Sequence, residues 1–83
     1  MNIKDKLRWK QVDHSERLYI NEIHVGNVWY NATTSREDKA YIYVGNSLLP
    51  GSAQKRSIHG TTPEEVKTLV ESLVIAWFEE ILK

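Results

Sequence analysis

The stretch TTPEEVKTLVESLVIAWFEEILK, residues 61–83, predicts a long C-terminal helix. Thr62 can serve as the N-cap, Pro63 takes the first helical position, and Glu65 completes a capping box three residues after the cap. Apolar residues then recur at steps of three and four, which is the spacing of one helix face. We expect a helix over residues 62–82, in which Leu73 and Trp77 are central to the contact with the rest of the domain. The expected apolar stripe consists of Val66, Leu69, Val70, Leu73, Val74, Trp77 and Ile81.

The middle of the chain has the composition of β-strands. The segments NVWYNAT and KAYIYVG are rich in β-branched and aromatic residues, and the polar segment TSRED between them is typical of a turn. We expect strands over residues 27–34 and 39–46. Side-chain alternation favours a register that pairs Tyr30 with Ile42 and Trp29 with Tyr43.

The segment RLYINEIHV, residues 17–25, reads as another strand, although its alternation changes phase half-way. We therefore expect a β-bulge at Asn21–Glu22, followed by a turn at Gly26–Asn27. A first strand is expected over residues 7–12, and a short edge strand is possible over residues 54–59, where exposed cations suit an edge.

These elements predict one α+β domain over residues 1–83. Its antiparallel sheet has three to four strands, and one long C-terminal helix packs on one face of that sheet.

The composition narrows the classes of function. The 83 residues include 11 basic and 11 acidic side chains, and a net charge of zero counts against a protein that coats nucleic acid. The chain has no cysteine, and its three histidines lack the spacing of zinc ligands, so we expect neither metal nor cofactor. His14 has acidic and hydroxyl neighbours in DHSE, but adjacent residues in a turn do not converge on one substrate atom. We expect no catalytic residue and no enzymatic activity.

The location of the protein is predicted from what the sequence lacks. No apolar run approaches the roughly 20 residues that a membrane span needs. The charged N-terminus has no apolar core of a secretory signal. We expect a cytoplasmic protein that does not bind membranes.

The open side of the sheet is the first candidate surface. One helix covers only one side, so Trp29, Tyr41 and Tyr43 should lie together on the other. Such rings can stabilise the sheet itself, contact a protein partner or stack on nucleic-acid bases.

The flank of the helix is the second candidate surface. Ile75, Phe78 and Leu82 lie beside the main stripe and form a compact apolar patch. This patch predicts a homodimer, or an interface with a partner, centred on Phe78. In the competing arrangement, residues 1–9 fold back over the same patch.

Basic side chains provide the third candidate. Lys55, Arg56 and His59 lie in a loop ahead of the helix, and Lys39 lies in the preceding strand. A phosphate could bind near the helix N-terminus. However, Glu64 and Glu65 already occupy that end, so a solvated edge or loop is the favoured interpretation.

The order of these segments resembles a known architecture. A bulged strand, Gly26, a Trp-Tyr hairpin strand, AYIYVG and then HGTTPEEVKTLVESLV resemble the small sheet-then-helix proteins common in phages and mobile elements. The shape is also similar to the double-stranded-RNA-binding domain and to the AP2-like arm-binding domain of phage integrases. The resemblance covers about residues 7–83. The RNA-binding family places a lysine-rich cluster on phosphates at the start of its last helix, and here only Lys67 corresponds to that cluster.

The resemblance implies a small non-enzymatic accessory module of the phage type, in the host cytoplasm if phage-encoded. The leading expectation is that it acts on an unidentified protein partner, which can be host-encoded, and that it can also form a homodimer through the helix end. This reading predicts no salt-dependent binding to oligonucleotides. The alternative is a nucleic-acid-binding domain that uses the open aromatic face and the basic loop 54–59.

Overall fold

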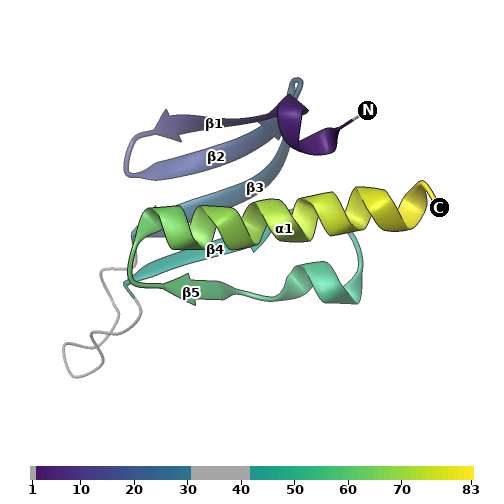
Figure 1. Cartoon of the computed structure of the whole chain (residues 1–83). Coiled ribbons are helices and arrows are strands. Elements are labelled where there is room, and N and C mark those ends of the chain that lie inside the picture. The colour runs from purple at the N-terminus through teal and green to yellow at the C-terminus, as the bar shows by residue number, and fades with distance from the viewer. Residues whose placement is uncertain (1, 31–41) are drawn as a thin grey trace.

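The computed structural model describes residues 2–30 and 42–83. In chain order the elements are the 3-10 helix η1 (Ile3–Lys6), β1 (Leu7–Val12), β2 (Ser15–Ile20), β3 (Ile23–Tyr30), β4 (Tyr43–Ser47), the 3-10 helix η2 (Ser52–Lys55), β5 (Ile58–Gly60) and α1 (Pro63–Ile81). The strands form one antiparallel sheet in the order β1-β2-β3-β4-β5, and α1 lies across one face of it (Figure 1). The predicted α+β fold is confirmed, with five strands where three to four were expected.

The helix begins with the cap that the sequence predicts. The Thr62 hydroxyl accepts a hydrogen bond from the Glu65 N–H at 3.2 Å, and Pro63 occupies the first turn. The Glu65 carboxylate reaches back to accept from the Thr61 N–H at 3.3 Å. One free N–H group of the first turn is therefore satisfied by the Thr62 side chain, and the Glu65 carboxylate binds the N–H of the residue before the cap rather than that of the cap itself.

The buried face of α1 is rotated from the predicted stripe. Val66, Val70 and Val74 are fully buried, whereas Leu69 remains 44% exposed. The prediction that Leu73 and Trp77 are central is wrong, because both are only half-buried on the flank beside η2. There the Gln54 side-chain amide donates to the Leu73 carbonyl at 3.0 Å, and the Trp77 indole donates to the Pro50 carbonyl at 2.8 Å.

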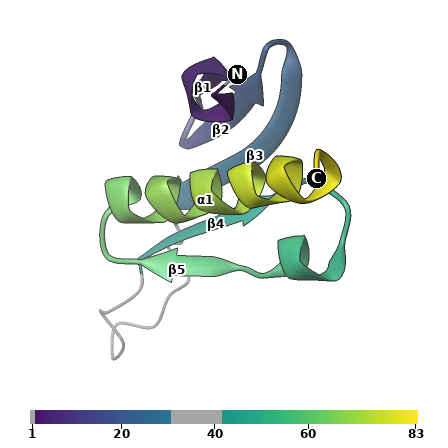
Figure 2. The same cartoon turned by 45° about the vertical axis from the view of Figure 1, so that its right-hand side comes forward.

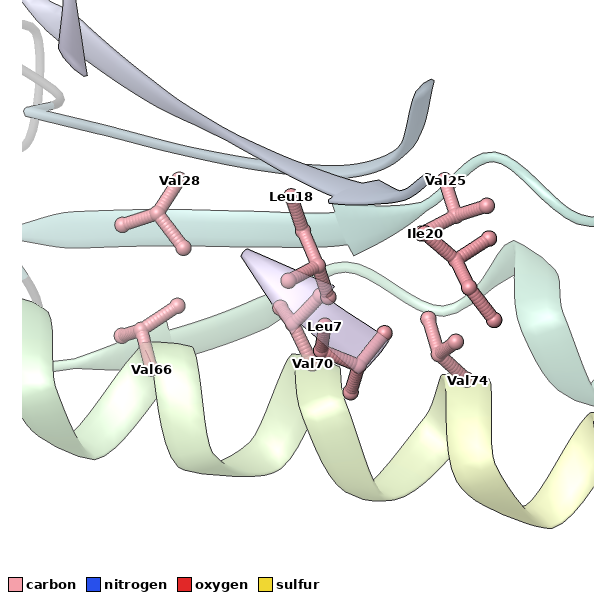
Figure 3. Packing of buried hydrophobic residues seen from close by; sticks show 8 residues of the cluster. All are labelled: Leu7, Leu18, Ile20, Val25, Val28, Val66, Val70 and Val74. Carbon is pink, nitrogen blue, oxygen red and sulfur yellow. The ribbon is translucent and has the colours of Figure 1, made fainter. Parts of the chain in front are cut away.

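Glycines in the sheet explain why valines take the central positions. A Cβ built on Gly45 would lie 2.5 Å from Cγ1 of Val66, and one built on Gly26 would lie 2.8 Å from Cγ1 of Val70. The helix thus approaches the sheet closely, and short side chains fill the narrow space. Figure 3 shows the resulting cluster of Leu7, Leu18, Ile20, Val25, Val28, Val66, Val70 and Val74.

The segment predicted as one bulged strand forms a hairpin instead. Asn21–Glu22 is a turn between β2 and β3, with Asn21 in the left-handed region at φ 55°. Asparagine tolerates this conformation, so the turn needs no glycine. The expected turn at Gly26–Asn27 is also wrong, because both residues lie within β3.

The β-bulge lies within β3, three residues beyond the predicted pair Asn21–Glu22. Leu18 pairs with Gly26 and Tyr19 pairs with His24, so Val25 is the extra residue on β3. This irregularity lets Val25 join the core while Gly26 still lies against Val70.

The register between β3 and β4 differs from the prediction by one residue. Tyr30 pairs with Tyr43, and Trp29 pairs with Val44. A shift of one residue moves a side chain to the other face of the sheet. Tyr43 therefore packs against the core beneath α1, with its ring 5.4 Å from that of Tyr30, and does not share a face with Trp29. Tyr41 and Lys39 lie outside the described residues.

The N-terminal segment packs beside α1. Ile3 in η1 is partly buried against the same core as Ile75 and Phe78. Helix η1 lies against α1, and these two helix residues are covered in part by the core of the same chain, which favours the arrangement in which residues 1–9 fold back. A homodimer centred on Phe78 loses the surface that motivated it, because only Leu82 of the predicted patch is largely exposed, at 70%.

Candidate functional site

Two contacts with the helix fix which side chains of β1 and β2 face away from it. The Trp9 indole donates to the Glu71 carboxylate at 2.6 Å, and the Glu16 carboxylate forms an ion pair with Lys67 at 2.5 Å. Because side chains alternate along a strand, Arg8, Lys10 and Arg17 lie on the opposite side, the open face of the sheet.

The strand pairing arranges the open face in three rows. The residues of one row are direct cross-strand neighbours. The rows are Arg8–Tyr19–His24, Lys10–Arg17–Asn27–Asn46, and Val12–Ser15–Trp29–Val44–His59.

Cations gather at the β1–β2 end of these rows. Lys10 and Arg17 are exposed and directly opposite each other, and neither forms an ion pair with a described residue. Arg8 lies two residues from Lys10, about 7 Å along the strand. Its guanidinium donates to the carbonyls of Asp5 and Leu7 at 2.8 and 2.9 Å, which holds this cation near the start of β1. Like charges directly opposite each other destabilise a sheet, so the pair has an energetic cost.

Rings and amides continue the surface across β2, β3 and β4. The Tyr19 and His24 rings stack with centroids 5.2 Å apart. His24 Nε2 lies 2.9 Å from the Gly26 carbonyl, which can only accept, so the imidazole donates from Nε2. The same nitrogen lies 2.7 Å from the Asn27 amide oxygen, and Asn27 donates to the Asn46 amide oxygen at 3.4 Å. These contacts hold polar groups in fixed positions beside the cations.

The three rows contain no acidic side chain. Helix α1 carries five glutamates and a single lysine, a net charge of −4. Asp13 and Glu22 lie in the turns at the ends of the strands. The net charge of zero thus conceals a separation between an acidic helix layer and a basic open face.

The sequence predictions located part of this surface. Trp29 lies on the open face as expected, half-buried beside Val44, but Tyr43 lies on the helix side. Lys55 and Arg56 are exposed next to β5, at the opposite edge from β1. His59 in β5 is exposed in the same row as Trp29.

The sequence predictions did not include the central cations of the open face. In LRWK and RLYI, charged or polar side chains alternate with apolar ones, which is the signature of a half-buried strand. Read together with the turns at both ends of β2, this alternation would have placed Arg8, Lys10, Arg17 and Tyr19 on one face.

Lys67 has an internal role. Besides its ion pair with Glu16, its ammonium lies 5.5 Å from the centre of the Trp9 ring. The one lysine that corresponds to the phosphate cluster of the RNA-binding family is thus used to hold α1 against β1 and β2.

His14 lies in the turn between β1 and β2. The Ser15 hydroxyl donates to the Val12 carbonyl at 3.1 Å rather than to the imidazole. A cleft of about 620 Å³ borders this turn, Glu16 and Pro63. Within the part of the chain that the structure describes, no three acidic, histidine or cysteine side chains are grouped to hold a metal ion.

No family model, curated protein or solved structure matches this chain. Among residues 2–30 and 42–83, no helix combines the length and the apolar character that crossing a membrane requires.

Proposed function

We propose that the protein is a binding module that holds nucleic acid on the open face of its sheet, mainly through the phosphates. The observation that carries this proposal is the direct pairing of Lys10 with Arg17, flanked by Arg8, on a face whose described rows contain no acid.

Protection of a sheet edge explains only part of this charge. Cations on an edge strand discourage pairing with another chain, which would account for Arg8 and Lys10 on β1. Arg17 lies on β2, between β1 and β3, where no edge needs protection. A cation kept in the interior of a sheet, opposite another cation, is better explained by an anionic partner.

Because the charges are separated in space, the net charge of zero does not count against nucleic-acid binding. Net charge opposes nucleic-acid binding only when the charges are evenly spread. Here the acidic helix lies on the far side of the sheet from the proposed site, so the potential at the open face is set by its own cations. For this reason we favour nucleic acid over the protein partner that was the leading expectation from the resemblance.

The expected affinity is modest. Three phosphate contacts correspond to a slope of log K against log salt of about −2.7, at about −0.9 per contact on duplex DNA. Binding that depends on so few contacts belongs in the non-specific range, with Kd of roughly 1–100 μM near physiological salt.

A salt titration tests the proposal. Fluorescence anisotropy with a labelled 20-base-pair duplex and the matching single strand would be recorded for the parent and for Lys10→Gln/Arg17→Gln. We expect the double variant to bind at least about 10-fold more weakly and to lower the slope by about 2. Lys55→Gln/Arg56→Gln removes the same charge at the opposite edge of the sheet and is the matched control.

Two results would count against the proposal. One is the absence of binding to either oligonucleotide at low salt. The other is an equal loss in the two double variants, which would mean that only the total charge of the chain matters.

A further inference from the structure

A second groove lies at the opposite edge of the sheet from Lys10. It occupies about 420 Å³ between β5 and α1. Its lining residues are Arg56, Ser57, Ile58 and His59 on one side and Leu69, Ser72 and Leu73 on the other. Figure 2 shows β5 as the outermost strand on this side, with α1 running alongside it.

We propose that this groove binds an extended peptide segment of a protein partner, which adds to β5 as a sixth strand. The peptide would place an apolar side chain against Leu69 and Leu73 and a carboxylate beside Arg56. An edge strand next to a helix suits this mode of recognition, because main-chain hydrogen bonds supply affinity and the helix supplies a pocket for alternate side chains.

The apolar part of the groove is accessible. Leu69 is 44% exposed although it belongs to the apolar pattern of α1, and Ile58 and Leu73 are half-buried beside it. Covering Leu69 would remove apolar surface from water, which favours binding. The Ser57 hydroxyl can pair with a peptide backbone, and the Ser72 hydroxyl, which donates to the Thr68 carbonyl at 3.0 Å, can accept from a peptide N–H.

The charge of the groove selects the chemistry of the partner. Arg56 contributes a cation, Lys55 precedes it in the chain, and no acidic residue lines the groove. An acidic side chain or a C-terminal carboxylate is therefore the complementary group, and arginine can bind such a group through two parallel hydrogen bonds.

The walls of the groove are fixed before any partner binds. Gln54 donates to the carbonyl of Leu73, and Trp77 donates to the carbonyl of Pro50, so η2 is tied to α1 at two points. A preformed groove loses little conformational freedom on binding, which favours affinity.

The competing explanation for the cations beside β5 is that they protect this edge of the sheet from pairing with another chain. Short edge strands with nearby cations are a common way to prevent unwanted pairing between sheets, and β5 has only 3 residues. This explanation does not account for the exposed Leu69, because an apolar side chain beside an edge favours association.

Selection from a displayed library of random eight-residue peptides tests the proposal. The library would be panned on the parent, on Leu69→Glu and on Leu82→Glu, with folding of each checked by circular dichroism. Leu82→Glu is the matched control, because it makes the same change at the C-cap of the same helix, at a position 70% exposed and outside the groove.

We expect peptides with alternating apolar residues and an acid to be enriched on the parent and on Leu82→Glu. Their binding, measured by anisotropy of the labelled peptide, should weaken at least about 10-fold in Leu69→Glu, since burial of one leucine is worth about that factor or more. Lys10→Gln/Arg17→Gln should retain the peptides, which separates this groove from the proposed nucleic-acid face.

Three outcomes would overturn the proposal. No enrichment above background is the first, and enrichment of peptides that bind Leu69→Glu equally well is the second. The third is a dimer of the parent that Leu69→Glu dissociates, because a second copy would then occupy the groove.

Discussion

Lys10 and Arg17 show at the scale of single residues how the proposed binding function would oppose stability. Their side chains are direct neighbours across β1 and β2, on a face whose described rows contain no acid to offset them. Like charges in this position destabilise a sheet by an amount comparable to what opposite charges contribute. The pair is explained if the sheet is stabilised when an anion binds.

This conflict predicts that removing one cation stabilises the free protein. Lys10→Gln should raise the free energy of unfolding by roughly 0.2–1 kcal/mol at low salt, as measured by urea denaturation. The gain should shrink in 1 M salt, where exposed charges are screened. A variant less stable than the parent at low salt would show that Lys10 has a stabilising partner and that the pair is not strained.

Gly45 makes a second prediction at this scale. A methyl group on Gly45 would press on Val66, so Gly45→Ala should lower the free energy of unfolding by roughly 1–3 kcal/mol. In a Val66→Ala background the same change should cost less, because the nearest Cγ atom is gone. The double-mutant cycle should give a coupling of at least about 0.5 kcal/mol, and strict additivity would contradict the close approach of helix and sheet.

Elements were predicted well where local chemistry decides them. The start of α1 follows from Thr62, Pro63 and Glu65, whose roles depend only on their neighbours in the chain. The rotation of its buried face was not predictable from spacing alone. It depends on Gly26 and Gly45, which are distant in the chain and allow valines, rather than leucines, to approach the sheet.

Strand pairing was predicted less well, for a physical reason. The turn at Asn21–Glu22 contains neither glycine nor proline, so the change of phase was interpreted as a bulge rather than as the end of a strand. The register of β3 with β4 depends on the path of the connection between them, which composition does not fix. An error of one residue there placed Tyr43 on the wrong face.

The packing of η1 on α1 makes a prediction at the scale of elements. Phe78 packs against the core and meets the Trp77 ring edge-on at 5.0 Å. Phe78→Glu should therefore lower the free energy of unfolding by roughly 2–4 kcal/mol, whereas Leu82→Glu should change it by less than about 0.5 kcal/mol.

Light scattering on the parent would complete this comparison. We expect a monomer at micromolar concentration. If the parent is a dimer and Phe78→Glu converts it into a folded monomer, the predicted interface at the helix end would be supported instead.

At the scale of the whole molecule, the fold separates three surfaces. The acidic helix covers one face of the sheet, cations and rings occupy the other, and the groove beside β5 lies at the edge opposite β1. The sequence predicted that the open face carries Trp29 and that Lys55 and Arg56 lie near an edge. The main cations of the open face were not predicted from the sequence, because they become neighbours only when β1 and β2 pair in the sheet.

Chemical-shift mapping tests the proposed binding face most directly. Backbone amide signals of the isotope-labelled protein would be followed while a 20-base-pair duplex is added at low salt. The account predicts the largest changes at Lys10, Arg17, Asn27 and Trp29, with small changes along the outer side of α1. Changes centred on α1, or on Arg56 and the groove beside β5, would contradict it, as would a spectrum that the duplex leaves unchanged.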